Sequence, residues 1–154
     1  MIQSANFAQP SKASTFTTIV SSSGIGFLQE IAIGKHLLIG DEPIEAGGTD
    51  AGPSPYDYIL AALGTCTSMT LTMYARQKQW PLQGVTVRLG HSKIHAEDCE
   101  ECAIKPRMLD RIDREIELAG PLTAEQRARL LEVAEHCPVH QTLTSTINIR
   151  SRLA

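Results

Sequence analysis

The sequence has no long hydrophobic run and no excess of basic charge. No apolar segment approaches the roughly 20 residues that cross a bilayer, and the N-terminus has no basic stretch followed by an apolar core, the pattern that marks a signal peptide. The net charge of −3 provides no positive field that would attract nucleic acid or an anionic membrane. We therefore expect a cytoplasmic protein that binds neither nucleic acid nor membrane.

Cysteine is also sparse, with four residues in 154. Cytoplasmic cysteines are normally reduced, so any disulfide is expected to be transient rather than structural. The other proportions, 42% hydrophobic and 20% charged residues, are ordinary for a globular protein. The length is sufficient for one domain with a core. We expect a flexible arm over residues 1–14 and a single domain over residues 15–154.

The first third of the chain favours strands. Short runs rich in β-branched and aliphatic residues predict three of them, and the last two are joined by a tight turn at Gly34-Lys35. Residues 40–55 are rich in glycine and proline and predict a loop. The predicted strands are Thr15–Val20, Gly26–Ile33 and His36–Ile39.

A long apolar helix is predicted next. It starts near Pro55 or Tyr56, ends before Pro81, and is apolar nearly all round. Such a helix is buried on most sides, and in a chain of this length one way to bury it is against a partner subunit. Met69 and Met73 are expected to fill the core.

The second half predicts strands around a further helix. Val85, Val87 and Leu89 alternate in a strand that continues toward His95. Thr123 and Gln126 form a capping box for a helix through roughly His136. A strand is predicted around Ile112, Ile116 and Leu118, and another over Thr144–Arg152. Strands at both ends with helices between them indicate an α+β fold with helices on one face of a sheet.

Two cysteines stand in protected settings. Cys66 falls about ten residues into the apolar helix, where the helix dipole affects a thiol little. Cys137 precedes Pro138, which favours Cys137 as a helix N-cap with His140 one turn away. Thiolates are the reactive form of cysteine, so the pair is a candidate for redox chemistry. The alternative is that both are small buried side chains.

A second cluster has the spacing H-x3-H-x3-C-x2-C, formed by His91, His95, Cys99 and Cys102. The C-x2-C half could chelate a metal such as zinc or form a labile disulfide. On a strand, His91 and His95 would share one face because their separation is even. The alternative is a solvated loop with an acidic surface.

Two motifs carry a family resemblance. The run GPSPYDYILAALGTCTSMTL around Cys66 resembles the signature of the OsmC/Ohr family, which comprises osmotically inducible and organic hydroperoxide resistance proteins. The run CPVHQTL from Cys137 is similar to the second cysteine motif of that family. The likeness extends over about Gly24–Leu153, and KIHAEDC at Lys93–Cys99 indicates a divergent branch.

The resemblance implies an α+β OsmC-like fold: a curved sheet packed on central cysteine-bearing helices in an intertwined homodimer. It implies thiol-dependent reduction of hydroperoxides in defence against oxidative stress, without metal or organic cofactor. Cys66 would be oxidised by a small hydroperoxide to a sulfenic acid and form a disulfide with Cys137, which an external dithiol reduces. The alternative is an OsmC-like protein without peroxidase activity, acting as a thiol redox sensor or as a ligand- or metal-binding dimer.

The chain departs from the family pattern at two positions. The family has a glutamate ten residues before the reactive cysteine, where this chain has Tyr56; the nearest acid is Asp57. Asp57 is therefore a candidate catalytic residue, with a solvated first-turn residue as the alternative. The family also has an arginine from the N-terminal sheet, and this chain has no arginine before Arg76.

Overall fold

The computed structural model describes residues 17–95 and 108–154. The chain divides into two compact units, residues 1–58 and 59–154, which we describe separately. Both contain antiparallel strands and helical segments, so the predicted α+β class is confirmed. Among the described helices, none is long and apolar enough to cross a membrane.

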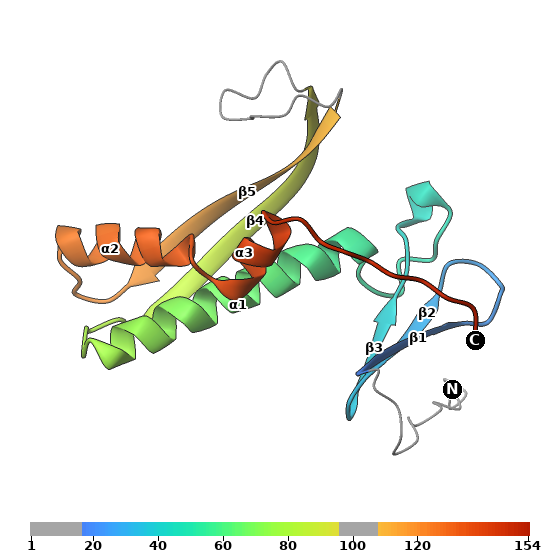
Figure 1. The fold of residues 1–154 in the computed structure, drawn as a ribbon, viewed down its shortest axis with the longest axis horizontal. Helices are drawn as coiled ribbons and strands as arrows, with labels where there is room; N and C mark the ends of the chain where they lie inside the picture. The colour runs from blue at the N-terminus through green and yellow to red at the C-terminus, as the bar shows by residue number, and fades with distance from the viewer. Residues whose placement is uncertain (1–16, 96–107) are drawn as a thin grey trace. The chain divides into compact units, whose positions relative to one another are not determined.

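The first unit contains a three-stranded antiparallel sheet in the order β1-β2-β3 (Figure 1). Thr18 pairs with Ile33 at one end of β2, and Gln29 pairs with Gly40 at the other. The predicted turn at Gly34-Lys35 is confirmed; Gly34 has φ of 58°, a left-handed conformation that suits glycine. The strands are β1 (Thr18–Ser22), β2 (Gln29–Ile33) and β3 (His36–Gly40).

A buried carboxylate organises the loop after β3, which includes the 3₁₀ turn η1 (Ile44–Ala46). Asp41 accepts hydrogen bonds from the hydroxyl and the amide of Thr49 at 2.6 and 2.9 Å, and from the amides of Glu42 and Ala51 at 2.9 and 3.2 Å. The Thr49 hydroxyl bond lowers the pKa of Asp41 most; burial opposes it, the amides reinforce it, and the pKa is about 2. The same loop requires Gly48, because a Cβ there would overlap the Glu42 carbonyl.

The second unit packs helices against a long hairpin (Figure 1). Strands β4 (Gly84–His95) and β5 (Met108–Ala119) pair antiparallel, with Gly84 opposite Ala119. Helix α1 (Pro55–Gln77) begins in the first unit and continues into the second, where α2 (Ala124–Ala134) and α3 (Pro138–Leu143) follow the hairpin. The capping box predicted at Thr123 is confirmed.

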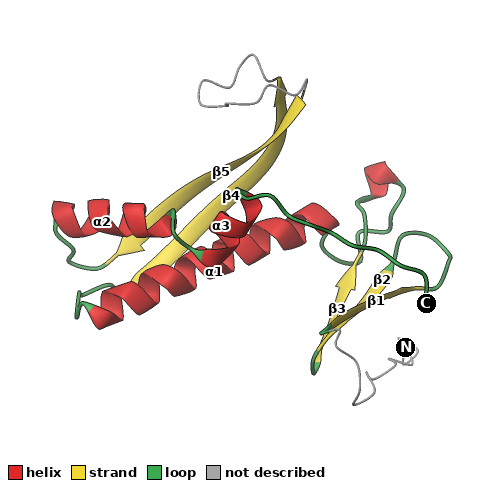
Figure 2. Cartoon of the chain, in the orientation of Figure 1, coloured by secondary structure: helices red, strands yellow, loops and turns green. Residues whose placement is uncertain are grey.

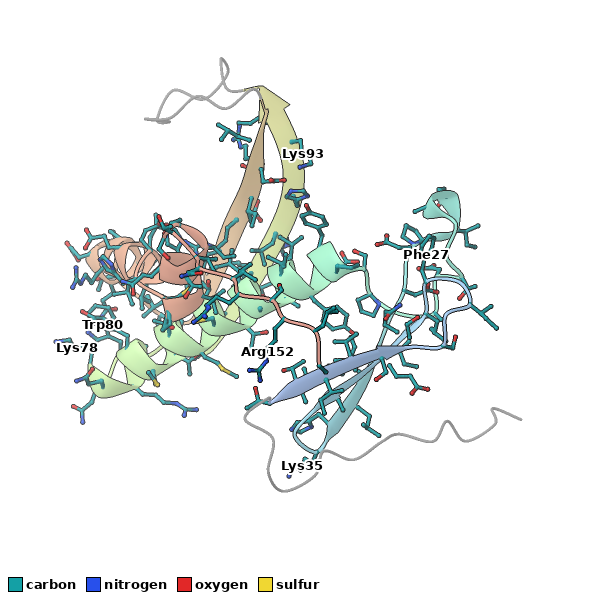
Figure 3. The ribbon with its side chains drawn as sticks, turned by 45° about the vertical axis from the view of Figure 1, so that its right-hand side comes forward. Phe27, Lys35, Lys78, Trp80, Lys93 and Arg152 are labelled. Atoms are coloured by element: carbon teal, nitrogen blue, oxygen red, sulfur yellow. The ribbon has the colours of Figure 1, made fainter. Side chains whose placement is uncertain are left out.

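One stripe of α1 is buried. Its residues recur every fourth position, as on a single helix face: Leu63, Thr67, Leu71 and Ala75. Leu71 and Ala75 join α2 residues Leu130, Val133 and Ala134 in the core cluster. Beyond the end of α1, the Trp80 ring packs edge-on against the Tyr74 ring with centroids 5.6 Å apart, and the Lys78 ammonium lies over the Tyr74 ring. Figure 3 labels Trp80 and Lys78 at this end of the helix.

Three expectations are corrected. The strand predicted over Thr144–Arg152 is wrong: the chain after α3 is irregular (Figure 2), and Ile149 is 82% exposed. Alternation gives a strand only where another strand accepts its hydrogen bonds, and none of the described strands does so here. The helix predicted through roughly His136 ends at Ala134, and a turn occupies residues 135–136. Met69 and Met73 are exposed, on the side of α1 away from the buried stripe, and so are not in the core of this chain.

Candidate functional site

The two cysteines of the motifs lie together in the second unit. Cys66 is in the middle of α1 and is half-buried, and Cys137 precedes α3 and is fully buried. The Cys66 side chain is close enough to Cys137 to lower the pKa of that thiol, and both cysteines are free thiols. The fold thus places side by side two thiols that are 71 positions apart in the sequence.

Cys137 lies in the short break between helices α2 and α3. The chain leaves α2 after Ala134 and restarts at Pro138, so Cys137 has an extended conformation and caps α3. Its sulfur accepts a hydrogen bond from the His140 amide at 3.4 Å. The predicted N-cap and the placement of His140 one turn on are confirmed.

Thr67 brings a hydroxyl to the same sulfur. It is fully buried within the otherwise apolar stripe of α1, and its Oγ1 lies 3.6 Å from Cys137 Sγ. The hydroxyl also donates to the Leu63 carbonyl at 2.8 Å. It accepts a hydrogen bond from Arg114 Nη1 at 3.0 Å.

Arg114 is a nearly buried cation on β5, with 10% of its side chain exposed. Its Nη1 also donates to the Ala134 carbonyl at 3.3 Å, and its Nη2 donates to Glu135 Oε1 at 2.8 Å. The other Glu135 oxygen lies 3.3 Å from His140 Nε2. Glu135 therefore links the arginine of β5 to the histidine of α3.

These contacts lower the pKa of Cys137. Burial is the largest single influence and raises the pKa. The His140 amide, the Thr67 hydroxyl, the Cys66 thiol and the positive charge of Arg114 act in the opposite direction and together outweigh it. Cys137 is accordingly the thiol that this environment favours as a thiolate.

A surface cavity of about 390 Å³ adjoins these residues. Arg114, Glu135 and His140 form part of its polar lining. Leu63, Ile112 and Leu143 provide apolar walls, while Asp110, Asp113 and Thr144 complete the boundary. The cavity can accept a molecule with an apolar body and a polar end.

The predicted site residue Asp57 has a local partner. Its carboxylate accepts hydrogen bonds from the Ser54 amide and hydroxyl at 2.9 and 2.7 Å, at the start of α1. The hydroxyl and then the amide lower the pKa of Asp57. These bonds are those of a helix-capping residue, and a catalytic role for Asp57 stays a prediction. Tyr56, at the position of the family glutamate, is 47% exposed.

The predicted metal cluster falls largely outside the described residues. Cys99, Cys102 and the side chain of His95 are not described. His91 Nε2 lies 2.8 Å from Asp110 Oδ1, which also accepts from Lys93 at 3.0 Å. Within residues 17–95 and 108–154, no group of three or more histidine, cysteine, aspartate or glutamate residues could hold a metal ion.

Sequence reasoning missed Thr67 and Arg114. Arg114 had a detectable signal, because it occupies a register position between Ile112 and Ile116 on the face of β5 that turns inward. A charge on an apolar face is rarely buried without partners, so it marks a polar site. Thr67 gave no comparable signal, since an uncharged threonine on a helix can bond the carbonyl four residues before it, as Thr67 bonds Leu63.

The chain matches the family model described as OsmC-like protein over residues 48–152. No curated protein sequence is significantly similar to it. Among solved structures, it resembles an organic hydroperoxide resistance protein from Elizabethkingia anophelis with TM-score 0.63 and 16% identity, over 85% of this chain and 89% of that one.

Two further solved structures share the fold. For an OsmC-like protein from Mycoplasma pneumoniae, the TM-score is 0.61 and the identity 17%, over 82% of this chain and 84% of that one. For an organic hydroperoxide resistance protein OsmC from Legionella pneumophila, the TM-score is 0.60 and the identity 19%, over 85% of this chain and 91% of that one. At these identities the structures show a shared fold, and the family model covers most of the chain: the protein belongs to the OsmC-like family.

Proposed function

We propose that this protein is a thiol-dependent peroxidase that reduces small organic hydroperoxides through Cys66 and Cys137. The observation that carries the proposal is the closeness of these two thiols, since the Cys66 side chain is near enough to lower the pKa of Cys137. Cys66 is half-buried, while Cys137 is fully buried and has a lowered pKa. Relatives of the same fold that are named organic hydroperoxide resistance proteins support the same chemistry.

In the first step, Cys66 attacks the terminal oxygen of the hydroperoxide. In the proposed step the Cys137 thiolate takes the proton of Cys66, and a new S–O bond forms at Cys66. The O–O bond breaks, and its electron pair leaves with the alkoxide, which takes a proton from solvent and departs as the alcohol. The sulfur is oxidised to a sulfenic acid and the peroxide is reduced.

In the second step, Cys137 attacks the sulfur of the Cys66 sulfenic acid. An S–S bond forms, the S–O bond breaks, and the hydroxyl group leaves with the Cys137 proton as water. An external dithiol then reduces the disulfide by two thiol–disulfide exchanges and is itself oxidised to a disulfide. This cycle uses no metal and no organic cofactor.

The proposed substrate class rests on the cavity lined in part by His140, the residue whose amide donates to Cys137 Sγ. Leu63, Ile112 and Leu143 favour an aliphatic or aromatic body, and the polar lining of Arg114 and His140 favours the oxygen end. Both features favour organic hydroperoxides over hydrogen peroxide.

We also propose that the working form is a homodimer. Met69 and Met73 expose 65% and 71% of their surface on α1. Separately, the sheet of the first unit leaves an apolar cavity of about 560 Å³ open, with Val20, Phe27 and Ile31 among its walls. Exposed apolar surface of this kind marks an interface. Sedimentation equilibrium should give twice the chain mass, and a Met69→Glu/Met73→Glu variant should give the chain mass.

A peroxide-consumption assay tests the proposed activity. The Cys99→Ser/Cys102→Ser variant removes the other two thiols and serves as the matched background, with turnover equal to the unchanged protein. Reduced protein is mixed with cumene hydroperoxide and a dithiol, and the products are mapped by peptide mass. We expect turnover together with a Cys66–Cys137 disulfide, recognised by a loss of about two mass units, the two thiol hydrogens.

Single variants separate the two roles. Cys66→Ser should abolish turnover. Cys137→Ser lacks both the proton acceptor and the second thiol, so without a dithiol it should react slowly and only once, and leave a sulfenic acid that dimedone traps. Turnover that persists in Cys66→Ser would contradict the proposal. Disulfide formation without peroxide turnover would favour the alternative of a thiol redox sensor.

A further inference from the structure

We propose that Thr67 and Arg114 are positioning residues for Cys137. When Cys137 is a thiol, the Thr67 hydroxyl accepts a hydrogen bond from it; when Cys137 is a thiolate, the hydroxyl rotates and donates a hydrogen bond to it. Arg114 holds that hydroxyl in place. This arrangement follows from the hydrogen-bond contacts of the Thr67 hydroxyl with Cys137 and Arg114. Its catalytic consequence rests on the function proposed above, because a Cys137 thiolate takes the proton of Cys66 in that cycle.

The Thr67 hydroxyl has only one proton for the neighbours around it. A hydroxyl has one proton to donate and two lone pairs to accept with. Thr67 Oγ1 has three neighbours, of which the Leu63 carbonyl can only accept and Arg114 can only donate. The third, Cys137 Sγ, can do either. With Cys137 as a thiol, Thr67 donates to Leu63 and accepts from Arg114 and Cys137, so every group is satisfied.

Ionisation of Cys137 changes only one partner. A thiolate cannot donate, so its neighbours must supply the hydrogen bonds that replace lost solvation. The His140 amide already donates to the sulfur, and rotation about the Thr67 Cβ–Oγ1 bond brings a second donor. In an α-helix the Leu63 carbonyl also accepts from the Thr67 backbone amide, so the rotation leaves no buried acceptor unpaired.

Arg114 keeps the hydroxyl available for this change. Because a guanidinium only donates, Arg114 occupies one lone pair of Thr67 Oγ1 in both states and polarises the O–H bond. Together with the bond to Thr67, its hydrogen bonds to the Ala134 carbonyl and the Glu135 carboxylate hold the guanidinium on three acceptors. Arg114 thus acts on Cys137 through Thr67 and through its charge.

The charged and titratable groups near Cys137 come from each element around it. Helix α1 provides Cys66, α3 provides His140, and Glu135 follows α2. Besides Arg114, strand β5 contributes Asp110 and Asp113 to the adjoining cavity. Since Glu135 is paired directly with Arg114, it offsets part of the positive charge, and the Thr67 hydroxyl gains importance as a neutral donor.

Titration of Cys137 by ¹³Cβ NMR of labelled cysteine tests the inference in the full-length reduced chain. Thr67→Val keeps the shape of the side chain and removes the hydroxyl; we expect its thiolate fraction near neutral pH to fall roughly tenfold or more, the effect of losing one hydrogen bond to a charged group. Thr67→Ser restores the hydroxyl and should titrate like the unchanged protein. Thr65→Val, an exposed threonine on the same helix, is the matched control.

Arg114→Gln should shift the titration in the same direction as Thr67→Val, with Arg111→Gln on the exposed face of β5 as its control. An unchanged midpoint in Thr67→Val, with circular dichroism showing the native fold, would overturn the inference. An unchanged midpoint in Arg114→Gln would overturn the part assigned to the arginine. The readout needs no peroxide, so failure of the proposed peroxidase activity leaves this test intact.

Discussion

The guanidinium of Arg114 and the carboxylate of Glu135 form a 2.8 Å ion pair whose arginine side is 90% shielded from solvent. The same carboxylate lies 3.3 Å from His140. The positive charge that favours a Cys137 thiolate is therefore partly neutralised by a half-exposed acid.

Removing that acid should make Cys137 more acidic. In Glu135→Gln, Arg114 keeps its charge and loses its counter-charge, so we expect the pKa of Cys137 to fall further, the opposite of Arg114→Gln. The ¹³Cβ titration measures it. Glu132→Gln is the control, because Glu132 is an exposed acid of α2 paired with Arg129. A midpoint that moves upward in Glu135→Gln would contradict this account.

The lowered pKa of Cys137 predicts a pH dependence of stability. Unfolding returns the thiol to its ordinary pKa near 9.0, so between the folded and unfolded pKa values the unfolded chain binds more protons. The free energy of unfolding should rise with pH up to about 9.0 and be lost as pH falls through the folded pKa. Urea unfolding under reducing conditions, followed by the fluorescence of Trp80, measures this. Cys137→Ser should remove that dependence, and an identical slope in this variant would contradict the prediction.

Asp41 should make the loop after β3 sensitive to acid. Its folded pKa of about 2 lies below the ordinary 3.8, so its stabilisation is present above pH 3.8 and is lost as pH falls toward 2. The protection of the Thr49 and Ala51 amides against hydrogen exchange, taken relative to the intrinsic exchange rate at each pH, should fall over that range. Asp41→Asn should exchange faster at neutral pH and lose the acid dependence. The exposed Asp50 of the same loop provides the control, Asp50→Asn.

The packing of α1 should be asymmetric. Leu71 is fully buried, and Leu71→Ala should lower the free energy of unfolding by about 2–5 kcal/mol through loss of burial and the cavity left behind. Met73, two positions away, is 71% exposed in the single chain. At concentrations where the chain is monomeric, Met73→Ala should change stability by less than about 0.5 kcal/mol. Equal losses in urea titrations of the two variants would contradict the assignment of the buried stripe.

Sequence reasoning failed where a feature depended on distant partners. The alternation in Thr144–Arg152 predicts a strand, but a strand exists only when another strand pairs with it. Likewise, the search for a cation before Cys66 passed over Arg114, because a strand late in the chain supplies it.

Local pattern determined the β2–β3 turn at Gly34, the capping box at Thr123 and the N-cap at Cys137, since each depends on hydrogen bonds between residues a few positions apart. Two cysteine motifs were enough to identify the family. Only the tertiary structure decided that Thr67 meets Cys137 across 70 positions and Arg114 across 47. The physical reason is that the partners of a buried polar side chain are donors and acceptors that the folded chain brings to it: the alternation in β5 marks Arg114 as facing inward, but the sequence pattern does not say which groups it meets.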